Sequence, residues 1–261
     1  MTPLSAGSLH NLPVSAMAKP PLGSEPASIS AIVGVMRELL SAVRAGLAAG
    51  ADPERAVGQQ RYMKSAMPYR GVRLPDVHRL CRIVYAEHRL PDRGSWEAAV
   101  RTLWDEAAFR EERYAAIALT GQRWYASYQD PGTMALYEHL TVSGAWWDYV
   151  DELAIRRVGP ILRADPAAIA PMLRDWSTDD DIWRRRTSII AQVGSKGDTH
   201  LDLLTDCLAP NLGRREFFVR KAIGWALREY AKTNSDWVRR YLLDHGGQLS
   251  GLSRREASKH L

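Results

Sequence analysis

The sequence predicts an all-α protein built from stacked pairs of helices. Amphipathic segments with a 3.6-residue period recur along the chain, and no segment shows the two-residue alternation of a half-buried strand. Trp147, Arg186 and Trp225 are also evenly spaced, since 186 − 147 = 39 and 225 − 186 = 39. A period of about 40 residues is typical of the two-helix HEAT-type repeat. The chain is therefore expected to form a curved stack whose concave face is a groove for an extended ligand.

The N-terminal region differs in composition from the rest of the chain. Residues 1–27 contain five of the 14 prolines together with several serines and glycines, which predicts a disordered tail. Residues 28–261 are predicted to form one domain of HEAT-like repeats. Its first helix is expected to begin at Ser28 or Ser30, either of which is a suitable N-cap, and to end at Gly50.

The same periodicity predicts twelve further helices. Their ends coincide with prolines or glycines, and Pro160 is one of these predicted breaks. The approximate ranges are 54–67, 75–89, 95–107, 110–126, 132–141, 145–157, 166–176, 180–193, 198–208, 214–231, 235–244 and 253–260.

The charge of the chain is unevenly distributed. The 35 basic and 30 acidic residues give a net charge of +5, and the pI is about 9.3. Residues 211–240 contain eight basic and three acidic side chains, so this window alone has a charge of 8 − 3 = +5. A basic surface of this kind favours a polyanionic partner such as nucleic acid. Within the window, Lys221, Arg228 and Lys232 are the residues predicted to contact such a partner.

The sequence carries no motif for a metal, a disulfide or a membrane. Cys81 and Cys207 are far apart and are predicted to be reduced and buried in helix cores. The seven histidines are scattered and form no metal-binding pattern, so neither a metal nor a cofactor is expected. No apolar stretch reaches the roughly 18–20 residues that span a bilayer, and we find no signal peptide. These observations predict a cytoplasmic protein without a membrane partner.

The segment 145–151, AWWDYVD, carries the best candidates for a functional site. Trp147 and Asp151, at positions i and i+4, share one helix face. Trp146 and Trp147 would point about 100° apart on a helix, so one of them is expected to face the groove. Asp148 and Asp151 are both compatible with solvated helix charges. Asp151 is the better catalytic candidate because it shares the face of Trp147.

Arg186 and Trp225 are singled out mainly by the 39-residue register. Arg186 belongs to a triplet of arginines, which is usually a solvated helix face. Trp225 lies in an otherwise apolar segment, so its composition alone would make it a core residue. Gly224 beside it indicates close approach of the backbone to another helix or to a ligand. If the register holds, two indoles, one carboxylate and one guanidinium line a single surface.

Three motifs resemble those of a known family. The segment 216–234, EFFVRKAIGWALREYAKTN, closely resembles the signature of bacterial AlkD-like DNA glycosylases, which are DNA alkylation repair proteins built from HEAT-like repeats. The segments WWDYVD (146–151) and WRRR (183–186) are similar to motifs of that family, in the same order and at matching spacing. Residues 62–72 resemble its first repeat more loosely. The resemblance extends over residues 55–261.

This resemblance implies a fold and an activity. Family members are right-handed superhelices of paired helices that clasp duplex DNA and hydrolyse the N-glycosidic bond of N3- and N7-alkylpurines such as 3-methyladenine and 7-methylguanine. It implies that Trp147, Asp151 and Trp225 form the catalytic cleft and that Arg186 contacts the DNA backbone beside the lesion. It also implies a monofunctional, monomeric enzyme that associates with the nucleoid and captures the lesion without a base-flipping pocket.

These residue types suit that chemistry. A quaternised purine is already a good leaving group and needs no general acid, so no second carboxylate or histidine is required. The sugar becomes positively charged as the bond breaks. Aromatic faces and a nearby carboxylate stabilise such a charge, and Asp151 is expected also to hold the attacking water. Duplex DNA containing alkylated purines is thus the expected partner.

Two other interpretations remain open at this point. The chain could be a catalytically inert HEAT-repeat scaffold that binds nucleic acid or an acidic protein through the surface of residues 211–240. It could also be a protein–protein adaptor, which would show no salt-sensitive binding to duplex DNA. The presence of Trp147, Asp151 and Trp225 distinguishes a glycosylase from an inert scaffold, because phosphate binding alone needs none of these residues.

Overall fold

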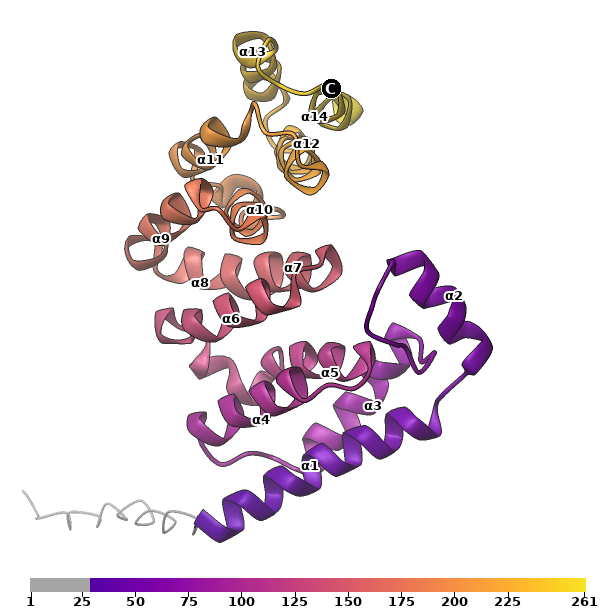
Figure 1. Cartoon of the computed structure of the whole chain (residues 1–261). Helices are drawn as coiled ribbons and strands as arrows, with labels where there is room; N and C mark the ends of the chain where they lie inside the picture. The colour runs from indigo at the N-terminus through magenta and orange to yellow at the C-terminus, as the bar shows by residue number, and fades with distance from the viewer. Residues whose placement is uncertain (1–28) are drawn as a thin grey trace, which may run out of the picture.

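The computed structural model describes residues 29–261, and these form a curved stack of helix pairs without a β-strand (Figure 1). The predicted tail, residues 1–27, and the candidate cap Ser28 lie outside the described residues. The prediction of an all-α superhelical stack is therefore confirmed for the part of the chain that the structure describes.

Fourteen α-helices follow one another between residues 29 and 261. They are α1 (Ile29–Ala49), α2 (Pro53–Met63), α3 (Leu74–Glu87), α4 (Arg93–Asp105), α5 (Arg110–Thr120), α6 (Met134–Gly144), α7 (Trp147–Leu153), α8 (Gly159–Ala164), α9 (Pro166–Thr178), α10 (Ile182–Ile190), α11 (Leu201–Leu208), α12 (Phe217–Ala231), α13 (Ser235–His245) and α14 (Gly251–Ala257). Short 3-10 segments connect several of them, and a π-helical turn, η3 (Ala154–Val158), joins α7 to α8.

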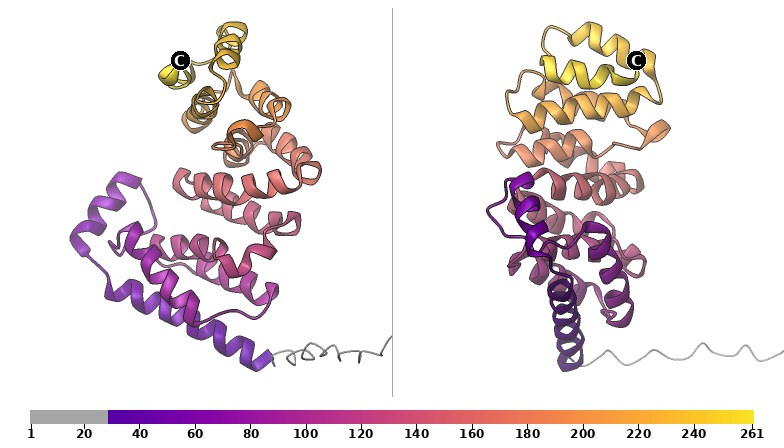
Figure 2. Two further views of the ribbon diagram at one scale, coloured as in Figure 1. Left: turned by 180° about the vertical axis from the view of Figure 1, so that it is seen from behind. Right: turned by 90° about the vertical axis from the view of Figure 1, so that its right-hand side faces the viewer.

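The helices form two layers, of which one carries the groove. Helices α3, α5, α7, α10 and α12 follow one another along the inner layer, each packed against the next, and α14 closes the series. Helices α4, α6, α9 and α11 form the outer layer, on the left in Figure 1. Figure 2 shows the same succession of helix pairs from behind and from the side. Consecutive repeats thus place equivalent positions side by side on the inner layer.

Local sequence sets where two of the inner helices begin. The Asp181 side chain accepts hydrogen bonds from the backbone N–H groups of Trp183 and Arg184, at 2.8 and 2.9 Å, and so caps α10. Before α7, Ala145 adopts a left-handed conformation with φ of 42°, and Trp146 is extended. This tight corner makes Trp147 the first residue of α7.

The predicted break at Pro160 is wrong. Helix α7, the turn η3 and helix α8 form one continuous helical segment over residues 147–164. A proline inside an α-helix leaves one carbonyl without its N–H partner and crowds the preceding turn. The wider π turn immediately before Pro160 accommodates both effects, so the helix continues.

Helix α2 stands apart from the stack as an arm. Asp52 caps its first turn, and Lys64 ends it in a left-handed conformation with φ of 50°, so it is shorter than the predicted range 54–67. Met63 is its one buried residue. Figure 1 shows the arm across the open side of the stack from α7. Its last turn carries Tyr62, which is 78% exposed.

Two clusters of buried apolar side chains hold the stack together. One extends mainly from α1 to α9 and includes Trp96 and Trp104, which are fully buried, and the other lies mainly between α10 and α14. Burial of each large apolar side chain stabilises the fold by about 1.5–3 kcal/mol. Both Cys81 and Cys207 are buried with free thiols, as predicted. Across residues 29–261, no helix combines the length and apolar character needed to cross a membrane.

Candidate active site

Three segments of the chain meet at one groove on the concave side of the stack. Two adjoining hollows, of about 820 and 780 Å³, share four lining residues, Tyr62, Trp147, Asp151 and Trp225. We call the two hollows together the aromatic groove. Its walls come from the arm α2, from α7 and from α12, and both indoles are half-buried. The structure thus brings together the three residues that were predicted to be catalytic.

The carboxylate of Asp151 is held by Arg186. The guanidinium donates from Nε to Oδ1 at 2.7 Å and from Nη2 to Oδ2 at 2.9 Å. It also donates from Nη1 to the carbonyl oxygen of Phe218 at 2.6 Å. The side chain of Arg186 is 5% exposed and that of Asp151 is 15% exposed. Since a guanidinium has five N–H groups, these contacts leave two of them for a further acceptor.

Burial raises the pKa of Asp151 above its ordinary value of 3.8. Removal from water disfavours the charged carboxylate, and this effect exceeds the opposing hydrogen bonds and positive charge of Arg186. The negative charge of Asp148 acts in the same direction as burial. A carboxylate with a raised pKa is a better proton acceptor than a solvated aspartate, which suits a residue that activates water.

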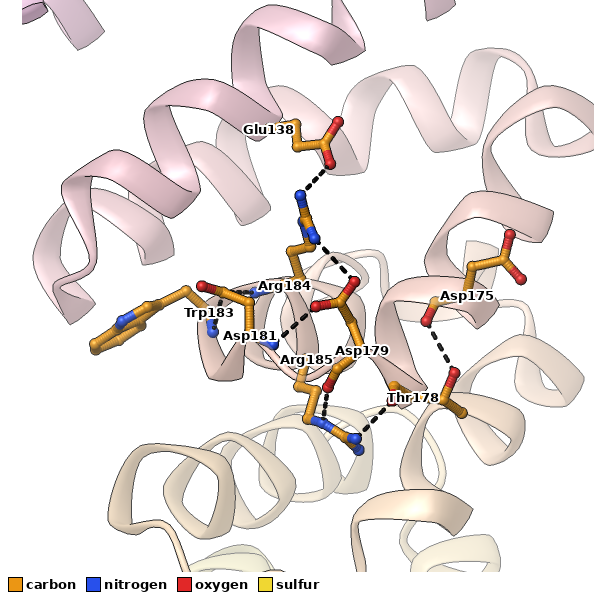
Figure 3. Close-up of polar contacts among 8 residues, drawn as sticks. All are labelled: Glu138, Asp175, Thr178, Asp179, Asp181, Trp183, Arg184 and Arg185. Carbon is orange, nitrogen blue, oxygen red and sulfur yellow. Dashed lines mark hydrogen bonds and ion pairs between the residues drawn. The ribbon is translucent and has the colours of Figure 1, made fainter.

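The three arginines of the triplet point in different directions. Arg184 binds Glu138 at 2.7 Å and Asp179 at 2.9 Å (Figure 3), and it lines neither hollow of the groove. Arg185 donates to the backbone carbonyl oxygens at the end of α9, including that of Thr178 at 2.6 Å (Figure 3). Arg186 alone lines the groove. The 39-residue register therefore singled out the member of the triplet that lines the groove.

Trp225 faces the groove because Gly224 packs against α14. A Cβ on Gly224 would lie 2.9 Å from the carbonyl oxygen of Ser253, closer than real Cβ contacts, and would also clash with Glu256. The glycine thus permits close approach of α12 to α14, one of the two alternatives that the sequence left open. With residue 224 directed at α14, the neighbouring indole is directed at the groove, where it lines both hollows.

Most of the predicted basic surface is paired with acidic side chains. Five of the eight basic residues in the window 211–240 form ion pairs. Lys221 and Arg228 line the groove and both bind Glu256, at 3.0 and 2.6 Å. Lys232 pairs with Glu229 at 2.7 Å and lines a smaller neighbouring hollow instead. The three basic residues of this window that were predicted as contacts therefore lie in different places. Lys221 and Arg228 line the groove together with Trp225, and Lys232 does not.

Glu256 organises the cations at this end of the groove. Besides Lys221 and Arg228 it binds Lys259 at 2.9 Å, and its own side chain is 10% exposed. The hydrogen bond from Lys259, with support from Lys221, holds the pKa of Glu256 at about 2. One buried carboxylate thus holds three cations, which leaves a local excess of positive charge.

Several groove residues were not predicted from the sequence. Tyr62 was part of the loosely matched segment but had no assigned role, and the sequence predicted the helix that carries it but not its position apart from the stack. Trp146 and Phe218 also line the groove and pack edge-to-face with ring centroids 5.5 Å apart. The doublet of tryptophans predicted that one indole would face the groove. In fact both reach it, with Trp146 at its aromatic edge.

Asp148 is not a solvated helix charge. Its two carboxylate oxygens accept hydrogen bonds from Nη2 of Arg110 at 2.7 and 2.8 Å, and Oδ2 also accepts one from the Tyr114 hydroxyl at 2.6 Å. The side chain of Asp148 is 14% exposed and that of Arg110 is 6% exposed. This pair has no signal in the sequence because it joins residues 38 positions apart on neighbouring repeats.

The chemistry of the groove comes from carboxylates, indoles and guanidinium groups. Among residues 29–261, no three His, Cys, Asp or Glu side chains are grouped so that they could hold a metal ion. A largely buried carboxylate that shares a groove with two indoles is suited to stabilising a cation, and the Lys and Arg side chains of the same groove are suited to binding phosphate.

The structure defines the chain as an α–α superhelical repeat protein whose groove is lined by indoles, one aspartate, and Lys and Arg side chains. The chain belongs to the DNA alkylation repair enzyme family, whose model matches residues 43–261. It is similar to the solved structure of a predicted DNA alkylation repair enzyme from Enterococcus faecalis, with a TM-score of 0.71 and 28% identity over 81% of this chain and 96% of that chain. No curated protein matches the chain.

Proposed function

We propose that the protein is a monofunctional DNA glycosylase that hydrolyses the N-glycosidic bond of cationic N3- and N7-alkylpurines in duplex DNA. The observation that carries this proposal is the meeting of Trp147, Asp151 and Trp225 in one groove. A surface that only bound phosphate would need basic side chains, not a desolvated carboxylate in one groove with two indoles. Membership of the DNA alkylation repair enzyme family supports the choice of DNA as the substrate.

The reaction breaks the bond between C1′ of the deoxyribose and the alkylated ring nitrogen. The bonding electrons leave with the base and neutralise its positive charge, so no proton has to be delivered to the leaving group. Positive charge develops on the sugar, where the faces of Trp147 and Trp225 and the carboxylate of Asp151 stabilise it. Water adds to C1′ and gives its proton to Asp151, which yields an abasic site and a neutral alkylpurine.

Arg186 has two functions in this proposal. Its two bonds to Asp151 orient the carboxylate toward the groove. Its two remaining N–H groups bind the phosphate beside the lesion, and this contact would make the pair a bridge between the DNA backbone and the catalytic carboxylate. Lys221 and Arg228, held by Glu256, bind the backbone on the Trp225 side, and Lys232 contacts it further along.

The lesion is captured against the wall of the groove rather than in a base-flipping pocket. Trp147 and Trp225 line both hollows, so the sugar can lie between them while the base remains outside. Selectivity then comes from the lability of the charged base and not from contacts to its edge. This distinguishes the proposal from glycosylases that extrude the target base and read it in a closed site.

The proposal is tested by the release of free base from a duplex that contains a single 7-methylguanine. The purified protein should release 7-methylguanine under single-turnover conditions, and Asp151→Asn should lower the rate about 100-fold or more. Duplex affinity should stay within about twofold, because the carboxylate acts on charge that develops only in the transition state. Asp202→Asn on α11, which removes an exposed carboxylate that lines neither hollow, serves as the control and should keep the native rate. No release by the native protein would contradict the proposal and favour an inert scaffold.

A further inference from the structure

Arg110 and Asp148 lie at the junction between the two walls of the aromatic groove. Arg110 is the first residue of α5, and Asp148 lies in the first turn of α7, directly after Trp147. Nη2 of Arg110 donates to both oxygens of Asp148, at 2.7 and 2.8 Å, and both side chains are nearly buried. The guanidinium also lies 4.2 Å from the ring centroid of Tyr149. Arg110 thus holds the first turn of the helix that carries Asp151.

The same arginine holds the loop that supports the arm. Its backbone N–H donates to the carbonyl oxygen of Pro68 at 3.0 Å, and Nη1 donates to the hydroxyl of Ser65 at 3.3 Å. The neighbouring Glu111, fully buried, accepts hydrogen bonds from the backbone N–H groups of residues 70–72 at 2.9–3.1 Å. The loop 64–73, which follows Tyr62, is therefore fixed to the first turn of α5.

A chain of hydroxyl groups adds a second link between the loop and α7. The Tyr114 hydroxyl donates to Asp148 at 2.6 Å, so its oxygen is free to accept from the hydroxyl of Tyr69, which lies 2.9 Å away. Tyr69, Tyr114 and Asp148 all line the larger hollow of the groove. Tyr69 belongs to the loop 64–73, and Tyr114 belongs to α5. Every link of this chain therefore ends at Asp148.

Within residues 29–261, no hydrogen bond or ion pair joins α2 or the loop 64–73 directly to α7. All polar connections between the two walls pass through Arg110 or Tyr114 to Asp148. One wall carries Tyr62, and the other carries Trp147 and Asp151. The polar links across the groove are thus a single buried ion pair and one hydroxyl chain, which add to the apolar packing of α5 against α7. A buried pair holds its geometry because separating the charges would leave each uncompensated.

We propose that Asp148 is a positioning residue for base excision, which together with Arg110 holds the arm bearing Tyr62 at the correct distance from Trp147 and Asp151. The inference rests on the proposed glycosylase function, but it assigns a role to residues outside the catalytic set. Asp148 and Asp151 use two different arginines, from the preceding and the following repeat. The pair with Arg186 orients the catalytic carboxylate, and the pair with Arg110 places the opposite wall.

The variant Asp148→Asn tests this role, because it removes the charge but keeps an oxygen that accepts from Tyr114. Misplacement of the two walls should lower single-turnover release of 7-methylguanine by about 10- to 100-fold, with undamaged-duplex affinity within about twofold. Tyr62→Ala should lower the release rate by a smaller factor in the Asp148→Asn background than in the native protein, because the arm is no longer in place. Additive effects of the two changes would overturn the proposal.

The acid limb of the pH–rate profile provides a readout that a purely structural role would not move. The charged groups facing Asp151 are Arg186 from α10 and Asp148 from α7. Without the negative charge of Asp148, the pKa of Asp151 should fall, and the acid limb should move to lower pH. An unchanged limb in Asp148→Asn would overturn the proposal. Tyr114→Phe, which removes one hydrogen bond to Asp148, should slow release less and leave the limb in place.

A second ion pair controls for the loss of a two-bond aspartate–arginine contact outside the groove. Arg93 and Asp130 form such a pair, at 2.7 and 2.9 Å, and their side chains are more exposed, at 35% and 43%. Asp130→Asn should leave release of 7-methylguanine within about twofold of the native rate. A loss of rate in Asp148→Asn no larger than in Asp130→Asn would contradict a positioning role.

Amide hydrogen exchange separates this proposal from the proposed function, since it needs no activity. In the native protein the amides of residues 70–72 are bonded to Glu111 and should exchange slowly. Asp148→Asn should speed exchange in residues 64–73 and in the first turn of α7 together, and Asp130→Asn should not. Faster exchange confined to α7 would overturn the proposal even if the native protein released no base.

Discussion

Arg186 binds the carboxylate of Asp151 through two nearly parallel hydrogen bonds, 2.7 and 2.9 Å long, that join α10 to α7. The pair crosses from one repeat to the next, so stacking of the repeats itself assembles it. Because both side chains are largely buried, the charge of Asp151 depends on the balance between desolvation and this one guanidinium. Arg186 is therefore a partner of the proposed catalytic carboxylate as well as a proposed phosphate contact.

The first prediction concerns the pH dependence of base release. Release needs ionised Asp151, so the rate should be retained at high pH and lost as pH falls through the raised pKa, which lies above 3.8. Arg186→Gln removes the charge that opposes the effect of burial, so the acid limb should move to higher pH. Arg186→Lys keeps the charge and should shift the limb less. Single-turnover rates at a series of pH values, corrected for spontaneous depurination, would show this. A limb that moves to lower pH in Arg186→Gln would contradict the assignment.

The second prediction concerns the two indoles. Trp147→Ala and Trp225→Ala should each slow release of 7-methylguanine by about 10-fold, since each removes one aromatic face from the cationic sugar. The double variant should lose less than the product of the two effects, because both indoles line the same hollows. Trp237→Ala, on α13 outside the groove, is the control and should retain the native rate. Strictly additive losses would mean that the indoles act at separate places.

The third prediction concerns the leaving group. A groove without a general acid should release cationic 7-methylguanine and 3-methyladenine but leave neutral hypoxanthine and uracil in place. The comparison uses duplexes of one sequence that differ only in the central base, with base release followed by chromatography. Efficient excision of uracil or hypoxanthine would exclude the mechanism proposed here, although the fold and DNA binding would be unaffected.

The fourth prediction concerns salt. Affinity for undamaged duplex should fall steeply with salt and vary little with sequence, since phosphates supply most of the binding energy. Arg228→Ala should reduce the magnitude of the log–log salt slope by about 0.9, because the variant neutralises one phosphate fewer. Arg174→Ala, whose partner is Asp206 on the other side of the stack, is the matched control and should leave the slope unchanged. Fluorescence anisotropy at several salt concentrations measures both. A flat response of the native protein would favour the protein–protein adaptor.

Periodicity alone was sufficient to predict the helical class and much of the groove. The amphipathic pattern records which side of each helix is buried, and this is a local property of the chain. The 39-residue spacing of Trp147, Arg186 and Trp225 predicts that they share a face, because a repeat protein places equivalent positions of successive repeats side by side. The structure brings all three to the same groove.

The partners of these residues were decided by tertiary structure. From the sequence, Asp148 is expected to be an exposed charge on a helix. Only the packing of α5 against α7 brings it into an ion pair with the buried Arg110. Tyr62 reaches the groove because α2 leaves the stack, and a polar helix that buries only Met63 has no distinctive period. The ion pairs that neutralise much of the basic window also join residues far apart in sequence, such as Arg228 and Glu256. Burial and charge pairing arise between repeats. The pattern along one segment therefore predicts which face of a helix is buried, but not which residues of the neighbouring repeats that face contacts.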